Sequence, residues 1–359
     1  MITLRLEFRI SPLACGSQTF SRMINLGIVG LGPVWESRYR PVLEKLQHRV
    51  RIRAVFDPVA SRCDEVAGTL RAAPYQGVLA LMSHADVRGI LLLDSSWYGK
   101  ALIHFLRHTR KPVYLAGSLG EDWDELSRLR SLVESEGLLV MPEFSRRFTP
   151  ATCRLHELIA TRLGRPRHIA IDAVAPAPDS PDAIPGQKAG TDFLLGLLDW
   201  CRYVIRSSTV RVEARHLDPS SSPDKAHHRV AIEFADGRDH EHGPSTAELV
   251  VRHPGPSDEV PPTPAARLCF TVRCEKGEAV IDGPTQIRWT LTGGETATES
   301  LTADRSEVEV MIDHFCRRLV GGLIPVADIS DVCRCLRLVH ATRQSLATSA
   351  PIPLNGDYA

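Results

Sequence analysis

Residues 24–57 read INLGIVGLGPVWESRYRPVLEKLQHRVRIRAVFD, and this stretch decides the fold. An apolar run that ends in glycines (24–32) is followed by a segment whose apolar residues have helical spacing (37–46). A second apolar run, closed by an acid, comes next (51–57). Strand, helix and strand in so short a stretch form a βαβ unit, which implies a parallel sheet.

The same alternation continues to about residue 148. Predicted helices at 60–70, 97–109 and 122–137 alternate with predicted strands at 88–94, 111–117 and 138–144. Strands that alternate with helices in this way are typical of a doubly wound parallel sheet. The sequence therefore predicts an N-terminal Rossmann domain over residues 23–148, with residues 1–22 as a loose extension.

The pattern changes after residue 148. A helix (150–164), a strand (165–176), a Pro/Gly-rich loop and an apolar helix (190–205) precede a series of strand-like segments with no helix between them, at 209–217, 227–235, 246–253, 266–275, 278–283 and 286–292. Strands without intervening helices predict an antiparallel sheet. We therefore expect a C-terminal α/β domain with an open antiparallel sheet over residues 149–359, closed by final helices within 305–348.

Composition places the chain among globular proteins and narrows its partners. The 359 residues are 43% hydrophobic and 24% charged, and 43 basic side chains balance 43 acidic ones. This balance lacks the basic excess typical of nucleic-acid binders, and no apolar run is long enough for a membrane span. Nine scattered cysteines, an odd number, favour a reduced cytoplasmic setting. We expect no metal site.

The turn after the first predicted strand carries the first candidate binding residues. Gly30 and Gly32, with Pro33 and Val34 at the start of the helix, let the backbone approach a pyrophosphate at a helix N-terminus. Asp57 closes the second strand, where a carboxylate accepts hydrogen bonds from an adenosine ribose. The other interpretation of these residues is a plain strand–helix turn without a ligand.

Two residues bear on which dinucleotide would bind. Trp35 stands at the third glycine position of the fingerprint, so its indole either points outward or fills part of the pocket. Arg62 would favour a 2′-phosphate, but the Asp57 carboxylate opposes one, so NAD is preferred over NADP.

The order of motifs resembles the glucose-fructose oxidoreductase and inositol 2-dehydrogenase family (the Gfo/Idh/MocA group). The segments that carry the resemblance are GIVGLG (27–32), VFDP (55–58), KPVYL (111–115), SRRFTP (145–150), GTDFLLGLLD (190–199) and the ending at 313–341. The resemblance spans residues 24–354 and implies a Rossmann domain for NAD(P), an α/β domain whose open sheet makes homo-oligomer contacts, and oxidation of a secondary alcohol of a sugar or cyclitol.

The residues that perform this chemistry in the family are replaced here. Where the family carries Glu-Lys-Pro, with the lysine polarising the reacting oxygen, this chain has Ala116, Gly117 and Ser118. The family histidine that handles the proton aligns with Gly196. The Thr-Pro-Asn segment that lines the cofactor aligns with residues 94–96, of which we take Asp94 and Ser95 as cofactor-binding candidates.

Glycine has no side chain to accept a proton, so another group must do so if the chain is a dehydrogenase. Asp192 and Asp199 match the two family aspartates and share one helix face with Gly196. Together with Lys188, which precedes the helix, they are the candidate substitutes. The alternatives are that Asp192 is a helix N-cap and that Asp199 pairs with an arginine such as Arg202.

Two classes of function therefore remain open from the sequence. The first is an NAD(P)-dependent oxidoreductase of the sugar or cyclitol type with degenerate proton-transfer residues. The second is a catalytically silent homologue that binds a nucleotide or a sugar-like ligand or acts in regulation. Arg146 and Arg147 either bind a substrate anion or form a salt bridge in the linker.

Overall fold

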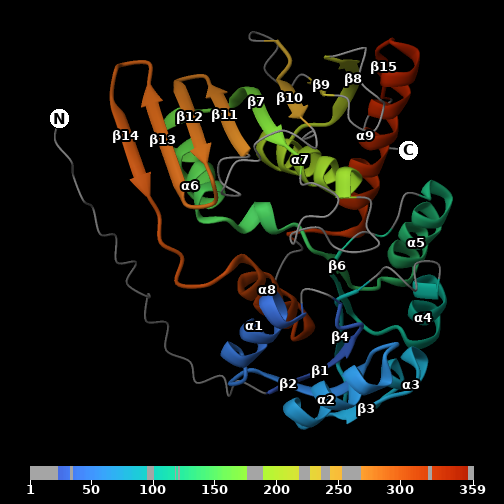
Figure 1. Ribbon diagram of the computed structural model, residues 1–359. Coiled ribbons are helices and arrows are strands. Elements are labelled where there is room, and N and C mark those ends of the chain that lie inside the picture. The colour runs from blue at the N-terminus through green and yellow to red at the C-terminus, as the bar shows by residue number, and fades with distance from the viewer. Residues whose placement is uncertain are drawn as a thin grey trace, which may run out of the picture.

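The computed structural model describes residues 23–32, 35–94, 101–117, 119, 122–175, 189–217, 227–235, 243–252, 268–321 and 326–354. These residues form two sheets, with sheet A in the lower half of Figure 1 and sheet B in the upper half. No helix in the described ranges is both long enough and apolar enough to cross a membrane.

Sheet A is parallel throughout, as predicted. Its strands lie in the order β3-β2-β1-β4-β5-β6. Their bounds are β1 Ile24–Val29, β2 Val50–Phe56, β3 Ala73–Pro74, β4 Gly89–Leu92, β5 Val113–Leu115 and β6 Val140–Pro142. This order reverses direction between β1 and β4, and ligands of such sheets bind outside the carboxyl ends of the strands at that point.

Helices cover both faces of sheet A, because its central strands are apolar on both sides. Their bounds are η1 Trp35–Tyr39 (a π-helical turn), α1 Arg40–Lys45, α2 Ala60–Leu70, α3 Val78–Met82, α4 Ala101–Thr109 and α5 Trp123–Glu136. Helices α1 and α2 share one hydrophobic core with the sheet, and α3, α4 and α5 share the other. The short β3 and α3 are elements that the sequence pattern did not predict.

In the described part of the chain, sheet B has nine strands in the order β14-β13-β12-β11-β7-β10-β9-β8-β15. The bounds are β7 Pro166–Val174, β8 Thr209–His216, β9 His228–Phe234, β10 Thr246–Arg252, β11 Leu268–Cys274, β12 Gly277–Asp282, β13 Gln286–Leu291, β14 Thr296–Ser300 and β15 Ile352–Pro353. The prediction of an antiparallel sheet needs one correction, because β7 and β10 pair in parallel. A helical crossover from β7 to β8 followed by two antiparallel pairings, β8 with β9 and β9 with β10, brings β10 back parallel to β7.

The remaining helices pack between and beside the two sheets. They are η2 Ser145–Phe148, α6 Pro150–Leu158, η3 Ile159–Leu163, α7 Ala189–Ile205, α8 Glu307–Leu319 and α9 Ile329–Thr348. Helices α6, α7 and α9 lie against sheet B (Figure 1). Side chains of Thr149, Ser306 and Asp328 accept hydrogen bonds at the N-termini of α6, α8 and α9, which explains where these helices begin.

Helix α8 returns to sheet A although it comes late in the chain. Its apolar face shares the core of α1 and α2, and the Phe315 ring lies edge-on to the Tyr114 ring with 5.9 Å between centroids. The buried Asp313 carboxylate forms ion pairs with Arg49, which directly precedes β2, and with Arg305 and Arg317. The N-terminal sheet is therefore completed by residues beyond 300.

Candidate functional site

The glycine turn lies at the point where the strand order of sheet A reverses. Gly30 and Gly32 have φ angles of +72° and +65°, which residues other than glycine rarely adopt. A Cβ on Gly30 would lie only 2.9 Å from the Cβ of Asp94, at the carboxyl end of β4. The glycines therefore let the loop after β1 pack directly on the end of β4.

Asp57 holds this loop in place. The residue is 5% exposed, and its two carboxylate oxygens accept hydrogen bonds from the backbone N–H groups of Leu31 and Val59, both at 2.9 Å. Arg62 lies 3.9 Å from the same carboxylate. The carboxylate thus fixes the turn between the two glycines, and its contact with a ribose stays a prediction.

The start of the first helix differs from the dinucleotide fingerprint. Trp35 is 3% exposed and belongs to the core under α1, so the alternative of an outward indole is wrong. Its indole N–H is buried without a partner in the described part of the chain. Pro33, Val34 and Ser95 lie outside the described residues.

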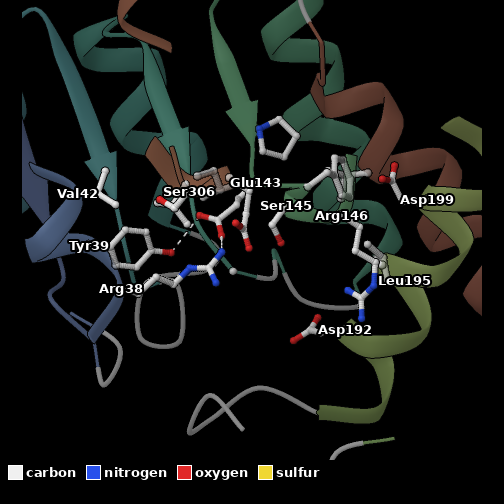
Figure 2. A pocket seen from close by; sticks show the side chains of 18 of the residues that line it. Arg38, Tyr39, Val42, Glu143, Ser145, Arg146, Asp192, Leu195, Asp199 and Ser306 are labelled. Carbon is white, nitrogen blue, oxygen red and sulfur yellow. Dashed lines mark hydrogen bonds and ion pairs between the residues drawn. The ribbon is translucent and has the colours of Figure 1, made fainter. Parts of the chain in front are cut away.

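A pocket of about 700 Å³ opens where the carboxyl ends of β5 and β6 face α7. Figure 2 shows Arg38, Tyr39 and Glu143 on one side of it and Arg146, Asp192 and Leu195 on the other. Residues from η1, α1, α8 and α9 complete its lining. Both positions at which the family residues are missing, Gly117 and Gly196, line this pocket together with Asp192 and Asp199.

Asp199 is bound by Arg147, whereas the sequence suggested an arginine such as Arg202 as its partner. Its carboxylate is 1% exposed and accepts two hydrogen bonds from Arg147, at 2.9 Å from Nε and 2.5 Å from Nη2. Arg147 also pairs with Asp331 at 3.1 Å and donates to the carbonyl of Val326 at 2.5 Å. Burial raises the pKa of the Asp199 carboxyl, and the Arg147 hydrogen bonds oppose that shift.

Asp192 lies in the first turn of α7, four residues before Gly196, and its side chain is partly buried at the pocket wall. Because α7 begins at Ala189, Asp192 is inside the helix and is not its N-cap. Lys188 lies outside the described residues. The structure thus brings Asp192, Asp199, Gly117 and Gly196 to one pocket.

Arg146 occupies the space that a side chain at position 196 would need. A Cβ on Gly196 would lie 3.3 Å from Nη1 of Arg146, and the guanidinium also lies 5.5 Å from the centroid of the Phe193 ring. Where the family has an imidazole on α7, this protein presents a guanidinium from η2.

The backbone at Gly117 also disfavours a side chain. Its φ is +80°, in the left-handed region, so a lysine at this position would be strained.

Sequence reasoning missed a cluster around Glu143, at the end of β6. Its carboxylate accepts hydrogen bonds from Tyr39 at 3.0 Å and Tyr114 at 2.7 Å, and it forms an ion pair with Arg38. Burial and the neighbouring Glu143 raise the pKa of both tyrosines well above the usual value, so both stay neutral. The available signal was a charged residue directly after a fully buried strand.

Searches of protein-family models and of curated proteins return no match to this chain. Solved structures, however, share its fold over nearly its whole length. An aldose-aldose oxidoreductase from Caulobacter crescentus superposes with a TM-score of 0.75 at 17% identity, covering 93% of this chain and 100% of its own. An oxidoreductase from Agrobacterium radiobacter, solved with NAD+, L-tartaric acid and magnesium, has a TM-score of 0.71 at 14% identity, covering 92% and 98%.

A third structure with the same fold is a super-repressor mutant of Gal80p from Saccharomyces cerevisiae. Its TM-score is 0.74 at 13% identity, covering 92% of this chain and 97% of its own. Identities this low establish the fold alone. They confirm the Rossmann sheet followed by an α/β unit that the resemblance implies, and they include proteins described as oxidoreductases and one described as a repressor.

Proposed function

We propose that this protein is a nicotinamide-dependent oxidoreductase that acts on a small sugar-like molecule, with NAD as the preferred cofactor. The observation that carries the proposal is the position of the pocket. It joins the carboxyl ends of β5 and β6, on the side of the sheet next to the glycine turn, to the α7 face that bears Asp192. Oxidoreductases with the same fold, one of them solved with NAD+, support it.

The described residues fit a dinucleotide at the reversal of the strand order. Gly30 and Gly32 give a tight turn against the end of β4, and Asp57 and Asp94 stand on either side of it. Pro33, Val34 and Ser95 complete the predicted set. The negative charge of Asp57 beside the turn disfavours a 2′-phosphate, which supports NAD over NADP. The bound cofactor would supply the hydride acceptor.

Asp192 is the group that we assign to the proton. Oxidation of an alcohol moves the hydride from carbon to the cofactor and the hydroxyl proton to a base. Asp199 matches the second family aspartate, but both of its oxygens are engaged by Arg147. We therefore propose that Asp192 accepts the proton, that Asp199 holds the pocket wall, and that Lys188 contributes from the preceding loop.

Binding of the cofactor is tested first, by thermal denaturation and calorimetry with NAD and NADP. Ligand that binds only the native state raises its melting temperature. We expect a shift at millimolar NAD, a smaller one with NADP, and weaker NAD binding in Asp57→Asn. Asp86→Asn, which changes an exposed aspartate, is the matched control and should leave binding unchanged. No shift with either dinucleotide would remove the proposal.

Turnover is tested separately, with a panel of polyols and aldoses in the presence of NAD. We expect reduction of NAD by at least one of them and its loss in Asp192→Asn, with cofactor binding retained. The glycines at positions 117 and 196 favour a second candidate, a silent homologue that binds ligand without reaction. NAD binding with no turnover in either direction on the whole panel would support that candidate.

Two further predictions concern the setting of the protein. We propose that it is cytoplasmic and forms a homo-oligomer through sheet B. The strands of sheet B carry exposed cross-strand ion pairs, such as Arg229 with Glu248 and Arg273 with Glu278. Analytical ultracentrifugation measures the oligomeric state, and a monomer at micromolar concentration would contradict this prediction.

A further inference from the structure

Two adjacent arginines at the pocket have opposite surroundings. Arg147 is satisfied by Asp199, Asp331 and the carbonyl of Val326, as described above. The side chain of Arg146 has no hydrogen bond or ion pair to any residue in the described ranges, and its Nε is buried without a partner. Among the described residues, the expected salt bridge is formed by Arg147 and not by Arg146.

The surroundings of Arg146 keep its guanidinium at the pocket wall. It lies over the Phe193 ring and against the open side of Gly196, and Figure 2 shows it beside Leu195 with Asp192 nearby. Burial lowers the pKa of Arg146, and the charge of Asp199 offsets part of that shift. The side chain is therefore a partly desolvated cation whose charge is not neutralised by a direct partner among the described residues.

A guanidinium carries five N–H donors in a planar fork, and burying it without acceptors is costly. Carboxylate and phosphate groups match this fork with two parallel hydrogen bonds and remove the cost. We propose that the pocket binds a small molecule through an anionic group, a carboxylate or a phosphate, held by Arg146. The inference rests on the proposed function and specifies its substrate class.

Asp192 indicates which chemical groups the other end of the ligand carries. Its carboxylate lines the same pocket and is an acceptor for hydroxyl groups, whereas it would repel a second anion. A sugar acid or a sugar phosphate has both features, an anionic group for Arg146 and hydroxyls for Asp192. A neutral sugar would leave Arg146 unsatisfied and bind more weakly.

Gly196 is part of this arrangement. A Cβ at position 196 would press on Nη1 of Arg146 at 3.3 Å, so any side chain there narrows the space of the guanidinium. Gly196 thus accounts for the absence of a proton-handling imidazole and also leaves room for the Arg146 guanidinium.

The test is isothermal titration calorimetry of the full chain with D-glucuronate, glucose 6-phosphate and D-glucose, with and without NAD. We expect at least one of the two anions to bind about tenfold or more tightly than D-glucose, since hydrogen bonds to charged groups contribute more than neutral ones. Binding of D-glucuronate alone identifies the carboxylate, and binding of glucose 6-phosphate alone identifies the phosphate. Equal binding of all three, or binding of neither anion, would overturn the inference.

Variants assign the effect to Arg146. Arg146→Met replaces the guanidinium by an apolar side chain and should weaken anion binding about tenfold or more. Lys45→Met removes a positive charge from another part of the same pocket and should change it less than about threefold. Unchanged anion affinity in Arg146→Met would also overturn the inference.

A second variant guards against misfolding of the first. Gly196→Ala favours the helix while pressing on the guanidinium, so it should fold and still weaken anion binding. Anion affinity equal to that of the unmodified chain would count against the inference. The NAD titration is read separately, so loss of cofactor binding with retained anion binding removes the proposed function and keeps the anion site.

Discussion

Replacing Asp199 by asparagine should destabilise the protein strongly while leaving its shape nearly unchanged. The Asp199 carboxylate is 1% exposed, and the Arg147 side chain is 5% exposed. The substitution removes the negative charge that faces Nε and Nη2 of Arg147, and it places an amide N–H₂ where one of these donors points. Arg147 then keeps only Asp331, at 3.1 Å, and the Val326 carbonyl.

Removing one partner of a buried ion pair costs about 3–5 kcal/mol, because the other charge is left without compensation. Because Asp331 still pairs with Arg147, we expect a loss near the lower end of that range. The free energy of unfolding is measured by urea denaturation followed by circular dichroism. The double variant Arg147→Met with Asp199→Leu should lose less than either single variant, because both charges of the buried pair are removed and Asp331 keeps Arg334 at 3.5 Å.

The matched control is Glu136→Gln, which breaks the exposed ion pair with Arg110 and should cost less than about 1 kcal/mol. A loss below about 1 kcal/mol in Asp199→Asn would refute the structural role assigned to Asp199. If Asp199→Asn loses turnover while losing less than about 1 kcal/mol of stability, Asp199 and not Asp192 would be assigned the catalytic role.

Three further predictions concern stability. Burial, with a smaller contribution from a nearby arginine, lowers the pKa of His156 from 6.5 to about 4, so folding favours its neutral form. Stability should therefore be complete above about pH 6.5 and fall as the pH drops toward 4, and His156→Phe should reduce this loss of melting temperature. A Cβ on Gly277 would overlap the carbonyl oxygen of Thr290, so Gly277→Ala should cost about 1–3 kcal/mol or more in urea unfolding. Gly117→Ala, at a φ of +80°, should cost about 1–2 kcal/mol, and Gly117→Lys should suffer the same strain without gaining turnover. An acid-induced loss in His156→Phe as large as in the unmodified chain would contradict the first prediction. An unchanged free energy of unfolding in Gly277→Ala or Gly117→Ala would contradict the second or the third.

Most of the fold could be predicted from the sequence, because its causes are local. The apolar runs around Ile28 and Leu91, with helical spacing between them, specify buried parallel strands whatever the rest of the chain does. Short elements such as β3 and α3 were not predicted, because a segment of two to five residues is too short to show a periodic pattern of apolar residues. The parallel pairing of β7 with β10 was not predicted, because it depends on which strands become neighbours in the folded sheet.

Which side chains meet and pair at the pocket was decided by the tertiary structure. The sequence alone determined that Gly117 and Gly196 lack the side chains expected from the resemblance, and that Asp192 shares a helix face with Gly196. It could not show that Arg147 pairs with Asp199, 52 residues away. Side-chain pairs of this kind arise only when packed helices and strands bring distant residues together. The same packing leaves Arg146 at the pocket wall without a described partner, because charge neutralisation is decided by distance in space and not along the chain.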